Sequence, residues 1–381
     1  MRKRFGILQK AFPPRGTRAA ALFRRPAKTW RMFHAAGRKR GLQVLFFRSE
    51  DVDFRRRRIH AWSTESEDGN TGWNRAWHPF PDVLYENYPV GVRGRGIGAR
   101  PVKARMAKLG IPVFNPFFFN KAKLHKLLNE NSEIASHLPE SISATRVSDI
   151  LALLNKHSFI YLKPIRGSQG KGIVEIRQTG ANRYAVRTSG PAAKGLRDIT
   201  MTEARLRAFC LRRLRKGKYL AQQGLDLIRR GDRKIDFRVV VHRGEDGQWH
   251  GAGIRPKLGR PGSIVTNSHA GGTKTTWEEL RAWADLSGTL LPAAEHLVKP
   301  AILAVKYLTR FRPTLSHLGI DVAVDRKGGI YLLDFNEIPG RDLLTPSMLK
   351  RVTDLTAGFA SYLAAQGRPP ARIGAVKHKL R

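Results

Sequence analysis

The segment HLGIDVAVDRKGGIYLLDFNEIPGR, residues 317–341, contains two short apolar runs on either side of a glycine-containing turn. This pattern predicts a β-hairpin. A turn centred on Lys327-Gly328 would place Asp321 directly opposite Asp334. Because side chains alternate along a strand, Asn336 would lie on the same face as Asp334. The sequence thus predicts two facing carboxylates with an amide beside them.

These facing carboxylates need a positive partner, because like charges directly across a strand pair destabilise the pairing. Two carboxylates and one amide oxygen form the kind of oxygen-rich set that Mg²⁺ prefers. Asp321, Asp334 and Asn336 are therefore candidate metal ligands. Arginine side chains of the same chain would neutralise the two aspartates equally well, and the hairpin alone leaves both explanations open.

The chain is strongly basic: 70 Lys and Arg residues against 30 Asp and Glu give a formal net charge of +40. Such an excess attracts polyanions, although a well-solvated surface accounts for it equally well. The basic runs are scattered and match no recognised nucleic-acid motif, so a nucleic-acid partner is not expected. They are RRRR (55–58), LRRLRK (211–216) and the ending RIGAVKHKLR. An acidic polymer remains a possible partner.

Length and composition predict a folded protein of two or three lobes, with 381 residues of which 41% are hydrophobic. No apolar run reaches the roughly 18 residues of a membrane helix, and the basic start lacks the features of a signal peptide. Cys210 is the single cysteine, which excludes a disulfide or a cysteine-rich zinc site within the chain. We expect a soluble, cytoplasmic protein.

Hydrophobic periodicity predicts a mixture of helices and strands, and hence an α+β fold. A segment rich in glycine and arginine, 91–101, is expected to mark a lobe boundary. The predicted strands are 42–47, 80–88, 159–164, 173–178, 219–223 and 236–242. The predicted helices are 121–138, a helix within 142–157, 202–216, a long segment over 276–308 broken by prolines, and 346–365.

The glycine-rich stretch KPIRGSQGKGIVEI, residues 163–176, joins two predicted strands. Its glycines allow the backbone to approach a ligand, and Ser168, Gln169 and the loop N–H groups can donate to phosphate. The stretch lacks the Walker A pattern and does not lead from a strand into a helix, which excludes a dinucleotide fingerprint. A hairpin folded over phosphates and an ordinary hairpin turn both fit.

Together, in this order, the motifs resemble the ATP-grasp superfamily, and more specifically its endospore coat-associated branch. The motifs that carry the resemblance are FNKAKLHKLL, YLKPIRGSQGKGI, YLAQQGLDL, DFRVVVHR, GIRPKLGRPGSIVTNSHAGGT and LGIDVAVDRKGGIYLLDFNEIPGR. The resemblance implies two α+β lobes that clamp ATP, preceded by an α/β domain. The expected boundaries are an N-terminal domain over 1–115, lobe A over 116–218, lobe B over 219–365 and a basic tail over 366–381.

The resemblance also implies residue roles. Phosphates of ATP would be reached by Lys121 and Lys163 and covered by Gly167, Ser168, Gln169, Gly170 and Gly172. Adenine would meet Gln222, Gln223 and Leu225, and the ribose would meet Asp236. Mg²⁺ would be held by Asp321, Asp334 and Asn336, while Arg255, Arg238 and Asn267 would act on the γ-phosphate.

Three positions depart from the family pattern. Asp334 stands where most members have glutamate, which is one methylene longer and can bridge two Mg²⁺ ions. Gly319 stands where the D-alanine–D-alanine ligase type has a catalytic arginine, so that role shifts to Arg255. Asn120 replaces a frequent aspartate before the first lysine.

The function that the resemblance implies is that of an ATP- and Mg²⁺-dependent ligase. It would activate a substrate carboxylate as an acylphosphate for attack by an amine. The resemblance also implies association with the endospore coat, with spore-coat proteins as partners. Two alternatives remain: a non-catalytic coat protein that binds an acidic polymer, and an ATP-dependent phosphotransferase. The carboxylate and amine substrates cannot be read from the sequence.

Overall fold

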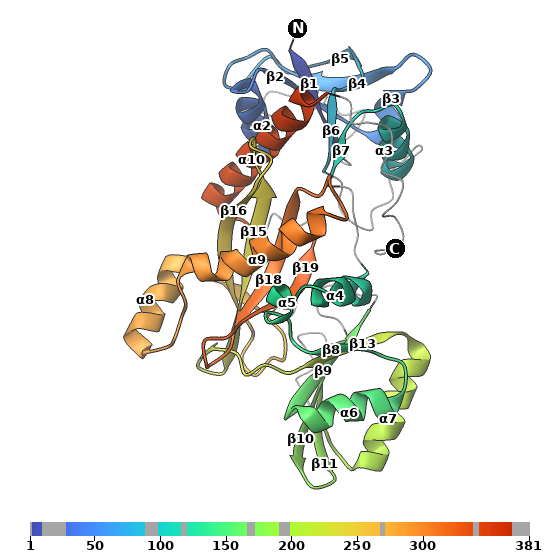
Figure 1. Cartoon of the computed structure of the whole chain (residues 1–381). Helices are drawn as coiled ribbons and strands as arrows, with labels where there is room; N and C mark the ends of the chain where they lie inside the picture. The colour runs from blue at the N-terminus through green and yellow to red at the C-terminus, as the bar shows by residue number, and fades with distance from the viewer. Residues whose placement is uncertain are drawn as a thin grey trace.

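The computed structural model describes residues 2–9, 28–87, 98–115, 120–165, 172–189, 199–266, 271–337 and 343–367. Three β-sheets follow one another along the molecule in Figure 1. The N-terminal sheet lies at the top, the sheet of lobe B in the middle, and the sheet of lobe A at the bottom. Within the described residues, no helix is both long and apolar enough to span a membrane.

The N-terminal domain is built on the parallel strands β2, β1, β6 and β7, extended on one side by an antiparallel group. Helix α2 buries Trp30 and Phe33 against this sheet, and Trp30 stacks on Phe46 with ring centroids 4.3 Å apart. Its elements are β1 (Lys3–Gln9), α2 (Lys28–Arg38), β2 (Leu42–Phe47), η1 (Ser49–Asp51), β3 (Val52–Asp53), β4 (Arg58–Ser63), β5 (Asn74–Pro79), β6 (Val83–Asn87), α3 (Ala99–Lys108) and β7 (Val113–Phe114).

Lobe A is an antiparallel sheet in the order β12-β11-β10-β9-β13-β8. Helices α6 and α7 pack their apolar residues against it, among them Leu206 and Cys210, which are fully buried. Its elements are β8 (Ser141–Ala144), α6 (Val147–Lys156), β9 (Phe159–Pro164), β10 (Val174–Gly180), β11 (Arg183–Thr188), β12 (Ile199–Met201), α7 (Glu203–Lys216) and β13 (Tyr219–Gln223).

Lobe B is a second antiparallel sheet, in the order β17-β16-β15-β18-β19, with β14 paired to β15. One face is covered by α9, and apolar residues of α4 and α5 belong to the same core, so these helices pack in lobe B although they fall within the bounds expected for lobe A. Strand β13 was expected to begin lobe B, but it pairs with β8 and β9 in the sheet of lobe A. The elements here are α4 (Lys121–Asn129), α5 (Ser132–Ala135), β14 (Arg229–Arg230), β15 (Arg233–Arg243), β16 (Trp249–Leu258), β17 (Thr273–Lys274), α8 (Trp277–Ser287), α9 (Ala294–Thr309), β18 (His317–Val324), β19 (Ile330–Asn336) and α10 (Pro346–Ala365).

The hairpin β18–β19 has the predicted pairing at its functional end and a different one at its turn. Asp321 lies opposite Asp334, as expected. Near the turn, however, Asp325 pairs with Gly329, because its carboxylate accepts the backbone N–H groups of Lys327 and Gly329 at 2.9 and 2.7 Å. A bulge at Leu333 then inserts one extra residue into β19 and restores the pairing at Asp321.

Two predicted helices are divided differently from the expectation. The segment 121–138 contains α4 and the short α5, because Asn131 ends one helical run and caps the next by accepting from the Ile134 N–H. Over 276–308 the break between α8 and α9 comes at Gly288, which adopts φ 64°, whereas Pro300 lies inside α9. The prediction that prolines break this segment is therefore wrong for Pro300.

Helix α10 joins lobe B to the N-terminal domain. Its first half packs Met348 and Val352 against β15 and β16 of lobe B. Its second half enters the core of the N-terminal domain, where Phe359 meets Phe114 edge to face with centroids 5.3 Å apart. Helix α10 thus packs against both the N-terminal domain and the sheet that carries the candidate site.

Truncating Phe359 should test this junction. Because the ring is fully buried, we expect Phe359→Ala to lower the free energy of unfolding by about 3–5 kcal/mol, measured by denaturant titration. Leu286→Ala is the matched control, since Leu286 is 90% exposed and its loss should change stability by less than about 0.5 kcal/mol. Equal unfolding midpoints for the two variants would contradict the packing described here.

Candidate functional site

A row of four charged side chains crosses lobe B from strand to strand. Arg255 of β16 lies opposite Arg238 of β15, which lies opposite Asp321 of β18, which lies opposite Asp334 of β19. Residues opposite one another in an antiparallel sheet point to the same face. Two arginines and two aspartates therefore stand side by side on one surface of the sheet.

Asp321 is the best-satisfied member of this row. Arg238 donates to it through Nε at 2.7 Å and through Nη2 at 3.2 Å, and Lys257 donates from Nζ at 2.9 Å. Burial disfavours a charged carboxylate, but Arg238 and Lys257 outweigh it and hold the pKa of Asp321 well below its usual value. Asp321 is therefore a carboxylate at neutral pH, held rigidly between two cations.

A second charged pair lies one pleat away on the same face. Lys257 Nζ is 3.1 Å from Asp236 Oδ1, and the Thr266 hydroxyl donates to Asp236 Oδ2 at 2.5 Å. Burial raises the pKa of Asp236, with Lys257 opposing and Asp321 adding to the shift. The buried ammonium of Lys257 is thus shared by Asp236 and Asp321, and it links this pair to the row of four charged side chains.

Asp334 meets a lysine from the start of α4. Lys121 Nζ donates to Asp334 Oδ2 at 2.7 Å, with about a third of each side chain exposed. Asn120 caps this helix, since its side chain accepts from the backbone N–H groups of Ala122 and Lys123. The cap fixes Lys121 in the first turn, directly over the metal-ligand candidate.

Lys163 lies on lobe A and reaches toward the same region. Its ammonium donates to the side chain of Gln222 on the neighbouring strand β13, and the Gln222 amide donates to the Ser141 hydroxyl at 2.9 Å. Burial lowers the pKa of Lys163 to about 8, although Asp334 acts in the opposite direction. His125 of α4 lies beside Gln222 at 3.3 Å, and burial together with Lys163 lowers its pKa to about 4.

A buried triad joins lobe A to lobe B beside these lysines. Lys234 of β15 donates to the Tyr161 hydroxyl at 2.6 Å and to Glu175 at 2.9 Å, and Tyr161 donates to Glu175 at 2.7 Å. Tyr161 and Glu175 lie opposite one another on β9 and β10, and Tyr161 shares a face with Lys163. The triad therefore fixes the base of the hairpin that carries the glycine-rich stretch.

Arg255 ends the charged row with an unused donor. Its Nε is buried and has no hydrogen-bond acceptor within the described part of the chain. A buried donor without an acceptor is costly, and an anionic ligand would satisfy it. This face of lobe B thus offers an arginine to a negative group at one end and a carboxylate to a positive group at the other.

The structure brings most of the predicted residues together and leaves some outside its description. Arg255, Arg238, Asp236, Asp321, Asp334 and Asn336 share one face of lobe B, with Lys121 above it and Lys163 and Gln222 opposite. Gly172 precedes β10 with φ 73°, Gln223 accepts the Glu140 N–H, and Leu225 is buried. Gly167, Ser168, Gln169, Gly170 and Asn267 lie outside the described residues.

The sequence reading missed Lys257, the most central cation of the site. Lys257 lies two residues after Arg255 on the same strand, so strand periodicity alone places both on one face. It also missed the triad of Tyr161, Glu175 and Lys234. No sequence pattern predicts this triad, because its three members lie on three different strands of two lobes.

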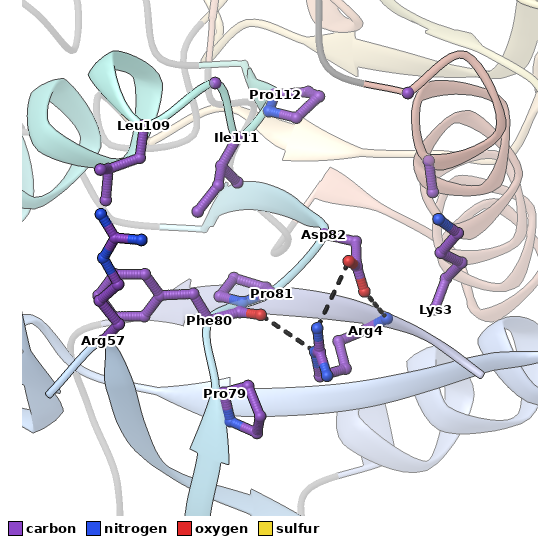
Figure 2. Close-up of a pocket in the computed structure, with 13 residues that line it drawn as sticks. Lys3, Arg4, Arg57, Pro79, Phe80, Pro81, Asp82, Leu109, Ile111 and Pro112 are labelled. Atoms are coloured by element: carbon purple, nitrogen blue, oxygen red, sulfur yellow. Dashed lines mark hydrogen bonds and ion pairs between the residues drawn. The ribbon is translucent and has the colours of Figure 1, made fainter. Parts of the chain in front are cut away.

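A separate cavity lies in the N-terminal domain, away from these residues. It has a volume of 510 Å³ and lies by the first residues of β1 and just before β6 and β7 (Figure 2). Arg4 already has partners there. Its side-chain Nε donates to the Phe80 carbonyl at 3.0 Å, and its backbone N–H donates to Asp82 at 2.7 Å. Strand β7 ends at the opposite side, where Asn115 accepts the N–H of His317 in lobe B. The cavity is thus not part of the charged site.

A family model described as YheC/D like ATP-grasp matches residues 110–363. The chain belongs to this ATP-grasp family. The match includes Lys121, Lys163, strand β13 and the hairpin β18–β19. The family membership and the ATP-grasp fold expected from the sequence are confirmed.

Two relatives come from Bacillus subtilis (strain 168). The endospore coat-associated protein YheD is 29% identical over 303 residues, which cover 77% of this chain and 65% of that protein. The endospore coat-associated protein YheC is 22% identical over 312 residues, covering 78% of this chain and 81% of that protein. The chain thus spans 65% of the length of the first relative.

Solved structures resemble the chain more distantly. A RiPP-associated ATP-grasp ligase of Chryseobacterium gregarium, in complex with ADP and a leader and core peptide, is 12% identical with a TM-score of 0.49. The alignment covers 97% of this chain and 100% of that one. Similarity of this degree carries no information about substrate.

The shared ammonium of Lys257 yields a stability prediction. We expect Lys257→Met to cost about 3–5 kcal/mol at pH 7, because it leaves the buried Asp236 without its cation. Asp236 has a raised pKa already, and without Lys257 that pKa rises further, so the cost should shrink as the pH falls and Asp236 takes up a proton.

Denaturant titrations between pH 5 and pH 8 measure this cost. The double variant Lys257→Met/Asp236→Asn should recover most of the loss, since it removes the charge that Lys257→Met strands. A cost for Lys257→Met that is independent of pH and is not reduced by Asp236→Asn would show that Lys257 is not the partner of Asp236.

Proposed function

We propose that this chain is an ATP- and Mg²⁺-dependent ligase of the ATP-grasp type. It would transfer the γ-phosphoryl group to a substrate carboxylate, and an amine would displace phosphate from the acylphosphate. The observation that carries the proposal is the register-matched row Arg255–Arg238–Asp321–Asp334, with Lys121 bound to its acidic end. Family membership supports ATP as the nucleotide.

The side chains at the acidic end fit one magnesium ion. The Asn336 amide donates to the Gly319 carbonyl at 3.2 Å, which directs its NH₂ group into the sheet and leaves Oδ1 as an oxygen ligand. Asp334 is about one-third exposed, and in the described part of the chain its Oδ2 is bound by Lys121 alone. No group of three or more His, Cys, Asp or Glu side chains gathers among the described residues, so the fit rests on Asp334 and Asn336 with Asp321 beside them.

A bound Mg²⁺ would withdraw charge from the β- and γ-phosphates of ATP. The chain's own residues would do the rest of the work. Lys121 would move from Asp334 to a phosphate oxygen, since the two cations compete for the same carboxylate. Lys163 would bind phosphate from the other lobe, and Arg255 would direct its unused Nε–H toward the charge that develops on the γ-phosphoryl group.

Arg238 and Lys257 would serve as positioning residues. Both donate to Asp321, so they keep it ionised and fixed while ligands bind and leave. No covalent enzyme intermediate is needed, because the acylphosphate forms on the substrate. By analogy with the named relatives, we propose that the reaction takes place in association with the endospore coat.

Nucleotide binding is the first test. We expect purified protein to bind Mg-ATP in isothermal titration calorimetry, with Lys163→Met and Asp334→Asn each weakening it roughly tenfold or more, as loss of a charge-assisted contact predicts. Leu286→Ala, far out on α8, should bind as the wild type does. Screening amino acids and acidic peptides for substrate-dependent ADP release would then identify the acceptor.

The proposal fails if Mg-ATP does not bind, or if both site variants bind it as tightly as wild type. Binding without ADP release in the presence of any carboxylate and amine would instead favour a non-catalytic coat protein. A stable phosphorylated product would favour a phosphotransferase.

The lowered pKa of Lys163 predicts a pH dependence. The ammonium form binds phosphate, and with a pKa of about 8 the free protein loses this proton as the pH rises through 8. ATP affinity should therefore be constant below that pH and fall by up to about tenfold per pH unit above it. Binding at pH 9 should take up a proton, which calorimetry in buffers of different ionisation enthalpy measures. In Lys163→Arg, which stays charged, both effects should disappear.

A further inference from the structure

The four arginines at 55–58 and the strands beside them have no role in the charged site of lobe B. All four are exposed; the first three lie in the turn between β3 and β4 of the N-terminal domain, and Arg58 begins β4. Within the described residues, Arg55, Arg57 and Arg58 form no ion pair, and Arg56 Nε is 3.9 Å from Asp53. Asp53 itself accepts the backbone N–H groups of Arg55 and Arg56 at 2.9 Å. Most of this positive charge is thus available to a partner.

An exposed aromatic pair lies next to these arginines. Trp77 of β5 lies opposite His60 of β4, and the rings stack with centroids 5.0 Å apart and an interplanar angle of 16°. Trp77 is 47% exposed, although it is among the largest apolar side chains of the chain. Partial burial and the nearby Arg75 lower the pKa of His60, so its ring is neutral at pH 7 and stacks as an aromatic.

Arg58 and the aromatic pair share one face of the antiparallel group β4–β5. The cross-strand pairs Arg58–Pro79, His60–Trp77 and Trp62–Arg75 follow one another at two-residue steps, so all point to the same side. We call Arg58, His60, Trp77 and Pro79 the Trp77 surface. Arg75 is bound to Asp51 at 2.6 Å and is held in place beside it.

Positive charge continues past this surface into the cavity of Figure 2. Pro79 belongs to both, and Arg57 and Lys3 line the cavity close by. A ligand with a negative backbone could therefore lie across several cationic groups while one flat group rests on Trp77.

The run 55–58 matches no recognised nucleic-acid motif and gave no such expectation, but with the stacked aromatic pair beside it we propose that the Trp77 surface binds single-stranded nucleic acid. Arginines meet the phosphates, and an unpaired base stacks on the free face of Trp77, whose other face is supported by His60. A duplex would offer the same charge but no open base face, because its bases are stacked inside. An acidic polypeptide would pair with the arginines and leave the aromatic pair unused.

The test uses the full chain and a fluorescein-labelled oligothymidylate of about 20 nucleotides, long enough to cover one such surface. Fluorescence anisotropy at fixed ionic strength should show tighter binding than to a duplex of the same length. Trp77→Ala should weaken binding roughly tenfold or more, and Trp77→Phe should restore it to near the wild-type value. Affinity for polyglutamate should be the same in all three proteins.

Arg58→Gln should weaken both the oligonucleotide and polyglutamate, and should reduce the slope of log affinity against log salt by about 0.7 for one phosphate contact. Leu286→Ala serves as the control for an exposed apolar side chain elsewhere. Thermal unfolding of each variant establishes that it is folded, which is expected because Trp77 and Arg58 are exposed.

Several results would overturn the proposal. Equal oligonucleotide affinity for Trp77→Ala and wild type would make the surface a general polyanion site, as would equal affinity for single strand and duplex. Displacement of the oligonucleotide by Mg-ATP would assign the binding to the charged row of lobe B. Absence of oligonucleotide binding would exclude it altogether.

Discussion

The arrangement of the charged site depends on how Asp321 is neutralised. A buried carboxylate opposite a second carboxylate would push the strands apart, and Arg238 and Lys257 remove that repulsion from the neighbouring strands. Because Arg238 uses two nitrogens, the contact fixes orientation as well as charge. Asp321 is thus neutralised by the chain's own cations, and in the proposed ligase Asp334 would be the carboxylate that exchanges its partner when a ligand binds.

In the proposed site, Lys121 would make Asp334 selective for a metal ion that arrives together with an anion. Its ammonium neutralises Asp334 in the absence of a ligand, and a metal ion can take its place only if Lys121 finds another anion. A triphosphate that arrives with its metal supplies both at once, so the proposed Mg²⁺ and ATP would stabilise one another. Because Asn120 caps the start of α4, the backbone of Lys121 is held in place, and only its side chain would move during the exchange.

Much of this could be predicted from the sequence, and the failures have identifiable causes. The final helix, 346–365, and the strand 42–47 match the structure residue for residue, because each is a continuous run with clear flanking signals. Strand β1 was missed because the segment that contains it, MRKRFGILQK, is basic and lacks an alternating pattern. In the structure, residues 5–9 of this strand are buried. The position of Asp321 opposite Asp334 was predicted correctly although the predicted turn was wrong. The real turn is one residue longer, because Asp325 pairs with Gly329, and the bulge at Leu333 compensates for that extra residue.

The sequence pattern did not predict which side chains of other strands and helices contact the two aspartates. The sequence offered magnesium and arginine as alternative partners of the two aspartates, and the structure gives the two carboxylates different cationic side chains as partners. Asp321 is bound by Arg238 and Lys257, whereas within the described residues Lys121 is the one side chain bound to Asp334, and about a third of the Asp334 side chain is exposed. Nothing in the hairpin itself distinguishes the two carboxylates, because the difference is made by strands β15 and β16.

This asymmetry bears on the shorter side chain at 334. A glutamate can place its two oxygens on two ions, whereas Asp334 is one methylene closer to its own strand, and its Oδ1 accepts the Phe335 N–H at 3.1 Å. Three donors already occupy Asp321, so a second ion would have to displace Arg238 or Lys257 from a buried carboxylate. One ion on Asp334 and Asn336 requires no such loss. In the proposed ligase, Arg238 and Arg255 would supply the charge that a second ion would otherwise bring, and they would serve in place of a cationic side chain at Gly319.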